Sequence, residues 1–179
     1  MQRHERFRRL IEPVHDGALT FARGLSRSRA DGDDLFQEAL VRALDKLDDL
    51  RDDGAFRSWL YRVIISVHRN QARGAFWRRL LPLGEHAGGE ATTPAPDDEI
   101  GGAERARLAL ASLSPEQREA IVLFEVEGWR IDEIARLQRA SSSAIKSRLS
   151  RGRDHLRRFY ARRFGVARTT PSLVPGEAP

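Results

Sequence analysis

The chain has 179 residues, enough for one domain or two small ones, and a formal charge of +5, which favours an acidic partner such as nucleic acid. No cysteine is present, which excludes disulfides and thiolate metal sites, and no apolar run approaches the roughly 18 residues of a membrane span. The N-terminal segment lacks the apolar core of a signal peptide, so we expect a cytoplasmic protein without membrane insertion.

The first two predicted elements are helices. Residues 3–27 carry apolar side chains at the i, i+3, i+4, i+7 spacing of an amphipathic helix. Pro13 lies inside this pattern, so either the helix kinks there or a new helix starts with Pro13 near its first turn. We expect a break at 28–32 and then a helix over 32–48, whose N-terminal aspartates complement the exposed amides and the helix dipole.

A third helix is predicted over residues 55–79, and its two halves differ in character. The first half has an apolar face that Trp59 continues, so we interpret Trp59 as a core residue. The second half is basic and aromatic, which is typical of a surface that holds single-stranded nucleic acid. There Trp77 is either a stacking platform or a packed side chain, and both roles stay open. The cations of this half are His68, Arg69, Arg73, Arg78 and Arg79.

Residues 81–102 form a predicted flexible linker, because they are rich in Pro, Gly and Thr and include a short acidic run. The linker divides the chain into two helical domains, which we place at 1–80 and 103–164. Residues 165–179 contain Pro, Gly and Thr, and we expect a disordered tail. The predicted fold is therefore all-α, with two small domains on a flexible tether.

The C-terminal domain begins with a short helix over 103–112. Residues 114–117 then read Ser-Pro-Glu-Gln, with an N-cap Ser, Pro at the first helical position and Gln three residues after the cap. Gly128 is expected to end that helix in a left-handed conformation. Residues 129–164 predict two further helices joined by a short turn, with Ser141 as the N-cap of the second.

The last predicted helix is strongly basic. Between 146 and 163 it carries eight Lys and Arg side chains against a single acid, Asp154. A helix-turn-helix whose second helix is this cationic is typical of proteins that enter a groove of DNA. The alternative is a solvated basic helix at the end of a bundle. The cations are Lys146, Arg148, Arg151, Arg153, Arg157, Arg158, Arg162 and Arg163.

Together these features resemble a bacterial RNA polymerase sigma factor of the extracytoplasmic-function (ECF) group within the sigma-70 family. No single motif is decisive, and the resemblance lies in their joint order and spacing from about residue 7 to residue 160. The matching segments are Asp33-Asp-Leu-Phe-Gln-Glu38, Phe56-Arg-Ser-Trp-Leu-Tyr-Arg62, Leu113-Ser-Pro-Glu-Gln-Arg118, Asp132-Glu-Ile-Ala135 and Lys146-Ser-Arg-Leu-Ser-Arg151.

The chain departs from the family pattern at the turn of the helix-turn-helix. The family usually has Gly there, whereas this chain has Arg139, and a non-Gly residue in a left-handed conformation costs about 1 kcal/mol or more. Gln138 and Ala140 replace residues that are usually apolar, and Arg130 stands where a Ser or Thr cap is common. We therefore expect the first helix of the motif to be shorter or less stable than in the family.

The resemblance implies a specificity subunit that is not an enzyme and needs no cofactor or metal. Its implied partners are core RNA polymerase, through the beta-prime clamp helices and the beta flap, promoter DNA, and an anti-sigma factor. The N-terminal domain would bind the clamp and melt and read the −10 element, and the C-terminal domain would read the −35 element. The implied core-binding residues are Asp33, Asp34, Gln37, Glu38 and Arg42; the −10 residues are Arg69, Asn70, Arg73 and Trp77; the −35 residues are Ser142, Ser143, Lys146, Ser147, Arg148 and Arg151.

Three alternatives compete with this interpretation. A helix-turn-helix regulator without polymerase contact would leave the acidic helix at 32–48 without a role. A sigma mimic that only titrates an anti-sigma factor would not need the dense basic helix. An enzyme with a magnesium site among the N-terminal carboxylates would also need a nucleophile and base or a Gly-rich phosphate loop, and we find neither.

Overall fold

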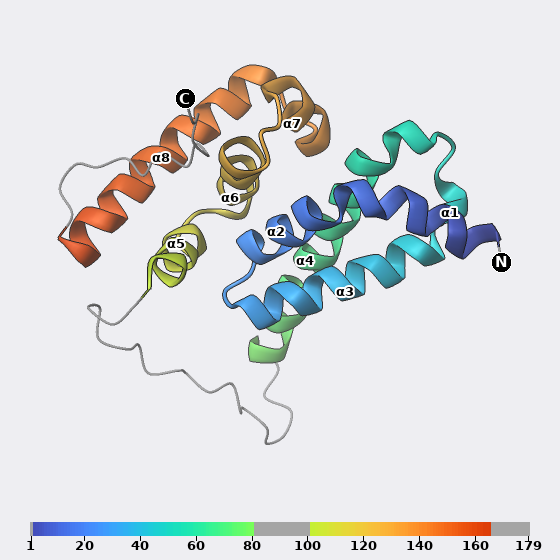
Figure 1. The fold of residues 1–179 in the computed structure, drawn as a ribbon. Helices are drawn as coiled ribbons and strands as arrows, with labels where there is room; N and C mark the ends of the chain where they lie inside the picture. The colour runs from blue at the N-terminus through green and yellow to red at the C-terminus, as the bar shows by residue number, and fades with distance from the viewer. Residues whose placement is uncertain (1, 81–100, 166–179) are drawn as a thin grey trace, which may run out of the picture.

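The computed structural model describes residues 2–80 and 101–165, with side chains described for 3–73 and 101–165, and the regular structure in these residues is entirely helical (Figure 1). This confirms the all-α prediction for the described part of the chain. The predicted linker, apart from its last two residues, and the predicted tail, apart from its first, lie outside the described residues. The N-terminal region contains α1 (Gln2–Ile11), α2 (His15–Leu25), α3 (Arg29–Asp45) and α4 (Phe56–Leu80); the C-terminal region contains α5 (Gly102–Ala111), α6 (Pro115–Ile121), α7 (Ile131–Gln138) and α8 (Ser142–Phe164).

The first predicted helix is divided at its proline. A short 3-10 helix, Glu12–Val14, separates α1 from α2 and contains Pro13 near its start. Pro has no backbone N–H and is tolerated at the start of a helix, so a new helical segment begins here. The second of the two possibilities left open by the sequence is therefore the observed one.

The predicted break at residues 28–32 is wrong, because α3 begins inside it. Ser28 is the N-cap, and its Oγ accepts a hydrogen bond from the amide of Asp31 at 3.0 Å. Gly32 lies buried within the helix, where an added Cβ would approach Arg23 Cα of α2 to 2.6 Å. The glycine therefore permits close packing of α2 on α3 instead of interrupting the helix.

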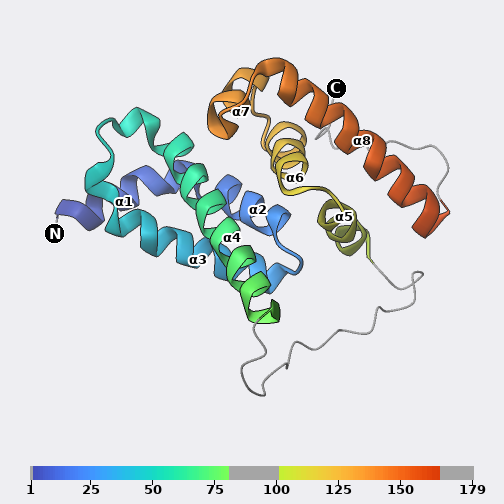
Figure 2. The same cartoon turned by 180° about the vertical axis from the view of Figure 1, so that it is seen from behind.

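The core of the N-terminal region lies between α2, α3 and α4, and Figure 2 shows α4 in front, crossing the other two helices. Phe21, Leu35 and Leu60, one from each helix, are fully buried there. Trp59 is partly buried against this core, with its ring centroid 5.9 Å from that of Phe56. The interpretation of Trp59 as a core residue is confirmed.

The C-terminal region has helices close to the predicted positions, although α5 covers Gly102–Ala111 instead of 103–112 and α6 ends at Ile121. Ser114 caps α6, with Oγ accepting from the amide of Gln117 at 3.4 Å. The chain continues from α6 through one π-helical turn, Val122–Val126, to Gly128, which has the expected left-handed conformation with φ of 65°. Buried side chains of α6, α7 and α8 then hold the helix-turn-helix together, among them Ile134, Ile145 and Leu149.

The turn of the helix-turn-helix forms although it has no glycine. Arg139 ends α7 in a left-handed conformation, with φ 51° and ψ 49°, and Ala140 donates its N–H to the carbonyl of Ala135 at 2.9 Å. At the start of α7, Glu133 accepts from the amide of Arg130 at 2.8 Å, which is the half of a capping box that does not require a Ser or Thr at the cap. Ser141 caps α8 as predicted, accepting from the amide of Ala144 at 3.1 Å.

The two regions pack against each other. Helix α2 contacts α5, α6 and the π-helical turn, and α4 contacts α7. Figure 1 shows α5 and α6 on the side of the C-terminal region that faces α2. Buried side chains of both regions belong to one apolar cluster. Nothing in the sequence predicted this contact.

Candidate nucleic-acid interface

The predicted core-binding residues lie on α3, and most of them face solvent. Asp34, Gln37 and Glu38 are exposed, and Arg42 is half-buried. Asp33 behaves differently, because Arg23 Nε donates to its Oδ1 at 2.6 Å, and this hydrogen bond and charge lower the pKa of Asp33.

Helix α3 also exposes an apolar side chain that sequence reasoning missed. Val41 is 62% exposed, three residues after Glu38 and next to Arg42. Residues three and four apart share a helix face, so Val41 joins Asp34, Gln37 and Glu38 in one surface. Val41 therefore adds apolar area to an otherwise polar face of α3.

The second half of α4 carries the predicted −10 residues. Asn70 and Arg73 are exposed, and Arg73 donates a hydrogen bond to the Asn70 side chain. His68 is half-buried, and burial, followed by the charges of Arg118 and Arg69, lowers its pKa. His68 is therefore neutral at pH 7 and does not join the cations, contrary to the expectation from sequence. The side chain of Trp77 lies outside the described residues, as do those of Arg78 and Arg79.

Arg69 is the −10 candidate whose position differs most from the expectation of a free cation. Its Nη2 lies 3.0 Å from both carboxylate oxygens of Glu119 in α6, and its Nε lies 3.2 Å from Oε1. The Glu119 side chain has no solvent exposure, whereas that of Arg69 is about half exposed. Gln138 Nε2 donates to the same carboxylate at 2.9 Å.

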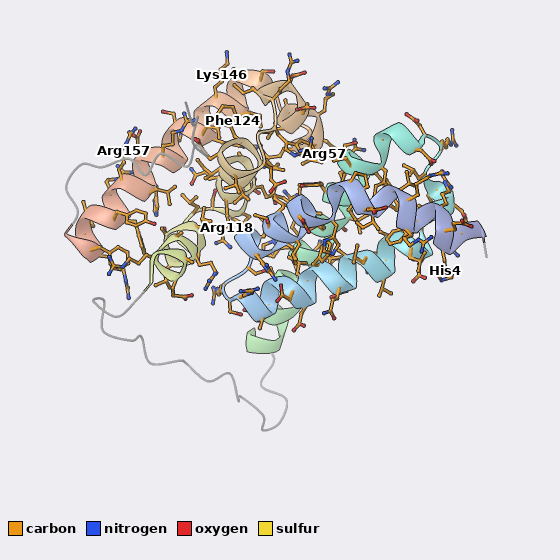
Figure 3. The ribbon with its side chains drawn as sticks, viewed as in Figure 1. His4, Arg57, Arg118, Phe124, Lys146 and Arg157 are labelled. Atoms are coloured by element: carbon orange, nitrogen blue, oxygen red, sulfur yellow. The ribbon has the colours of Figure 1, made fainter. Side chains whose placement is uncertain are left out.

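The predicted −35 residues occupy the first turns of α8, at the end of the molecule away from α3. Ser142, Ser143 and Lys146 are exposed, and Figure 3 shows Lys146 on the outer side of the helix. Arg151 is also exposed. Arg148 is held instead, because its Nη1 donates to Gln138 Oε1 at 2.6 Å. The remaining member of the set, Ser147, is half-buried.

Arg153 is turned away from this set. Its Nη2 lies 2.5 Å from Glu125 Oε1, and its guanidinium stands 5.4 Å from the ring centroid of Phe124. It contributes to packing within the C-terminal region. Arg157, Arg158 and Arg162 are exposed further along α8.

The surfaces belong to segments that match two family models. Residues 10–78 match Sigma-70 region 2, and residues 103–156 match Sigma-70, region 4. The ECF RNA polymerase sigma factor SigM of Mycobacterium tuberculosis H37Rv is 30% identical over 155 residues, covering 86% of this chain and 76% of that protein. The chain belongs to the ECF group of the sigma-70 family. The family is not a class of enzymes.

Further similarities agree with this membership. The sigma factor CnrH of Cupriavidus metallidurans is 34% identical over 145 residues, which cover 75% of this chain and 76% of CnrH. The structure of CnrH with the cytosolic domain of CnrY superposes with a TM-score of 0.61 at 26% identity, covering 84% of each chain. The sigma factor RpoE of Bartonella quintana, in complex with the anti-sigma factor NepR, gives 0.63 at 25% identity, covering 86% of this chain and 95% of that one.

Family membership makes this chain a promoter-specific sigma factor of RNA polymerase, with region 2 and region 4 at the matched residues. Within the described residues, no group of His, Asp or Glu is arranged to hold a metal ion. None of the helices described is both long and apolar enough to cross a membrane. The exact domain limits of 1–80 and 103–164 stay predictions.

The residues that join region 2 to region 4 escaped the sequence reasoning. They are polar or aromatic side chains in ordinary helices or in the connection 127–130 that precedes α7, so neither periodicity nor charge runs single them out. In the sequence Glu119 directly precedes the apolar residues Ala120 and Ile121, and only the structure shows that it is fully buried. The main members of this set are Arg57, Tyr61, Arg69, Arg118, Glu119, Glu127 and Trp129.

Proposed function

We propose that this sigma factor uses three separate surfaces for its three tasks. The exposed face of α3 binds the clamp helices of core polymerase, the basic half of α4 binds the −10 element, and the first turns of α8 read the −35 element as duplex. The observation that carries the proposal is the exposure of an acidic face on α3 and a basic one on α8 in a single chain.

The α3 surface fits a basic helical partner. Asp34 and Glu38 provide charge that steers association and suppresses wrong partners, while Val41 provides apolar area that a partner can bury. Asp33 has a structural role as well, because its carboxylate is already paired with Arg23. Its contribution to polymerase binding is therefore smaller than that of Asp34.

The two DNA surfaces suit different forms of DNA. Melting requires bases to leave the stack, which costs a few kcal/mol, and cations with aromatic side chains then hold the single strand. Arg69, Asn70 and Arg73 supply the polar part of such a site on α4. On α8, short serines allow close approach to the groove, while Lys146 and Arg151 reach phosphates or guanine edges.

An anti-sigma factor is a further proposed partner. The superposed structures of RpoE and CnrH are complexes with NepR and with the cytosolic domain of CnrY, respectively. Their similarity to this chain over most of its length supports a comparable inhibitor here. A factor with these partners acts in the cytoplasm, where the polymerase and the chromosome are.

In vitro transcription with purified core polymerase tests the function. We expect the factor to co-purify with core and to direct initiation on a subset of genomic fragments, and mapped start sites will reveal both promoter elements. Failure to bind purified core would refute the function. A regulator without polymerase contact would instead bind DNA and not direct initiation.

A charge-reversal pair tests the α3 surface. Asp34→Lys with Glu38→Lys is expected to abolish core binding, because it places cations against a basic partner. Glu5→Lys with Glu12→Lys is the matched control, since it changes the net charge equally on exposed positions of α1 and the following turn. Equal loss in both variants would show that net charge, not the α3 face, controls binding.

A further inference from the structure

Two glycines on one face of α2 form the contact with region 4. Gly17 and Gly24 are seven residues apart, which places them on the same side of the helix. A Cβ at Gly24 would lie 2.9 Å from Val122 Cγ1, and a Cβ at Gly17 would lie 2.5 Å from Glu127 Oε2. Glycine inside a helix costs about 1 kcal/mol relative to alanine, so two of them here are explained by the close approach of region 4.

Aromatic and polar groups surround this glycine face. Tyr61 of α4 donates its hydroxyl to Glu127 Oε2 at 2.7 Å, and its ring centroid lies 4.8 Å from that of Trp129. The guanidinium of Arg57 stands 4.6 Å from the Trp129 ring centroid, and Figure 3 shows Arg57 where the two regions meet. Burial raises the pKa of Tyr61 and of Glu127. The Tyr61 hydroxyl and the Glu127 carboxylate are thus paired at the contact, while Arg57 stays exposed and the buried Nε1 of Trp129 finds no hydrogen-bond partner among the described residues.

Arg118 joins helices of both regions at their C-terminal ends. Its Nη1 donates to the carbonyl of Leu25, the last residue of α2, at 2.7 Å. Its Nε and Nη2 donate to the carbonyls of Leu110 and Ala111 at the end of α5, each at 2.7 Å. Unpaired carbonyls and the negative end of the helix dipole favour a cation at such positions. Figure 3 shows Arg118 between α5 and α2.

A chain of polar side chains then connects the two predicted DNA surfaces. Arg69 of α4 pairs with Glu119 of α6, Glu119 accepts from Gln138 of α7, and Gln138 accepts from Arg148 of α8. Glu119 is fully buried, and among the described residues the side chains that donate hydrogen bonds to its carboxylate are Arg69 of region 2 and Gln138 of region 4. The Nε and Nη2 groups of Arg69 already donate to Glu119, so they cannot make the same contacts with a DNA phosphate.

We propose that this factor is autoinhibited by its own region 4, which docks on the Gly17–Gly24 face of α2 and withholds Arg69 from −10 DNA through Glu119. The proposal rests on the proposed role of Arg69 in binding −10 DNA. The closed form leaves the α3 face and the first turns of α8 exposed. Inhibition therefore acts on the −10 surface and spares the other two.

The closed form lowers the apparent affinity of the −10 surface for DNA. The apparent affinity of the −10 surface for single-stranded DNA equals the intrinsic affinity multiplied by the fraction of open molecules. Partners that bind only the open form, such as polymerase together with a promoter, raise that fraction by their preference for it. No inhibitor protein is required for the closed form, and an anti-sigma factor that grips both regions would stabilise it further.

A reversible tether tests whether the closed form exists and whether it inhibits. A Cβ at Gly24 would lie 3.6 Å from the Cβ of Val122, within the range of disulfides, and the chain has no other cysteine. In the full chain carrying Gly24→Cys and Val122→Cys, we expect mild oxidation to form the intramolecular disulfide. The oxidised protein should not support transcription with core polymerase, and reductant should restore it. Each single variant is the control for loss of activity by oxidation alone.

Two results would overturn the proposal: absence of the disulfide in folded protein, or equal transcription by the oxidised and reduced forms. A second variant tests the proposal by DNA binding alone, without polymerase. Gly24→Gln cannot fit against Val122 but is compatible with an exposed helix, and we expect it to bind a fluorescent single-stranded oligonucleotide about tenfold more tightly than wild type.

Gly102→Gln is the matched control for that variant, because an added Cβ there meets nothing within 4 Å. Adding Arg69→Ala to Gly24→Gln should remove the gain. Unchanged oligonucleotide binding by Gly24→Gln would refute autoinhibition. Failure of the reduced protein with core polymerase, while the oligonucleotide gain persists, would count against the proposed sigma activity and leave the autoinhibitory contact standing.

Discussion

Helices α4 and α8 both carry predicted DNA contacts, but they present them very differently. On α4, Arg69 is engaged by the buried Glu119, and His68 is uncharged at pH 7. On α8, Lys146 and Arg151 face solvent. The sequence made the two helices look alike, as basic segments that follow an apolar face. Their availability differs because only α4 lies against the other region.

The difference shows that cationic composition alone does not make a binding surface. A carboxylate brought from a distant part of the chain neutralises Arg69, whereas the acids near α8 pair with side chains outside its first turns. Glu125 pairs with Arg153 and Asp154 with Arg157, so the N-terminal part of α8 keeps its charge. In the closed form the cations proposed to bind duplex DNA are therefore exposed, whereas Arg69, proposed to bind single-stranded DNA, is paired with Glu119.

Destabilising α8 should have the largest effect, because the helix carries one of the two DNA surfaces. Ile145 is fully buried between α8 and its neighbours, so Ile145→Ala removes apolar contacts and leaves a cavity. We expect a loss of about 2–5 kcal/mol in the free energy of unfolding, measured by urea denaturation and circular dichroism. Lys146→Ala, at the exposed neighbouring position, should change that free energy by less than about 0.5 kcal/mol. Similar losses for both would mean that Ile145 does not anchor the helix.

Removing the exposed cations of α8 tests its contribution to duplex binding without unfolding the helix. Lys146→Ala with Arg151→Ala should weaken duplex binding about tenfold and lower the slope of log affinity against log salt by about two. Fluorescence anisotropy over a salt series measures both quantities. Arg158→Ala with Arg162→Ala removes equal charge further along the helix. If this control weakens binding as much, the first turns have no special role.

The turn before α8 offers a smaller effect of opposite sign. Arg139→Gly should stabilise the protein by about 1 kcal/mol, because glycine adopts the observed left-handed conformation without steric strain. Thermal and urea unfolding measure the gain. Arg139→Ala keeps the strain of a side chain at positive φ and serves as the control. A gain in the alanine variant as well would assign the effect to the lost arginine and not to the backbone.

Local features were largely predictable from the sequence. Caps and breakers act over a few residues, and Ser114, Gly128 and Ser141 all have the expected roles. The failure at 28–32 is also local in origin, because this polar stretch, which ends in Gly32, was interpreted as a break between two helices. Its actual role depends on Arg23 in the neighbouring helix, and a contact between helices leaves no periodic signal.

The residue types of the candidate site were predictable from the sequence, but whether each cation is free or paired was not. The basic halves of α4 and α8 follow from residue types, and family resemblance supplied their proposed roles. Sequence could not show that Glu119 would reach Arg69, since fifty residues and an intervening linker separate them. Whether a cation is available depends on such long-range pairing, which only the packing of the two regions reveals.

The smallest expected effect concerns pH and the carboxylate that engages α4. Burial raises the pKa of Glu119 above its ordinary 4.5, whereas hydrogen bonds and charge from Arg6 lower the pKa of Asp53 below its ordinary 3.8. A raised pKa in the folded state gives stability that is complete below the unfolded value and is lost as the pH rises through the folded value. A lowered pKa gives stability present above the unfolded value and lost as the pH falls. Relative to Glu119→Gln, wild type should therefore lose stability as the pH rises above about 4.5.

Relative to Asp53→Asn, wild type should instead lose its advantage as the pH falls below about 3.8. Urea unfolding of both pairs across a pH series compares the two directions in one experiment. Asp53 is the suitable reference because it lies in region 2, away from the contact with region 4, and its Oδ1 accepts from Arg6 Nη2 at 2.7 Å. If both differences change in the same direction, Glu119 is not desolvated in solution. Region 4 would then not close over Arg69 as the structure shows, and α4 and α8 would be equally available to DNA.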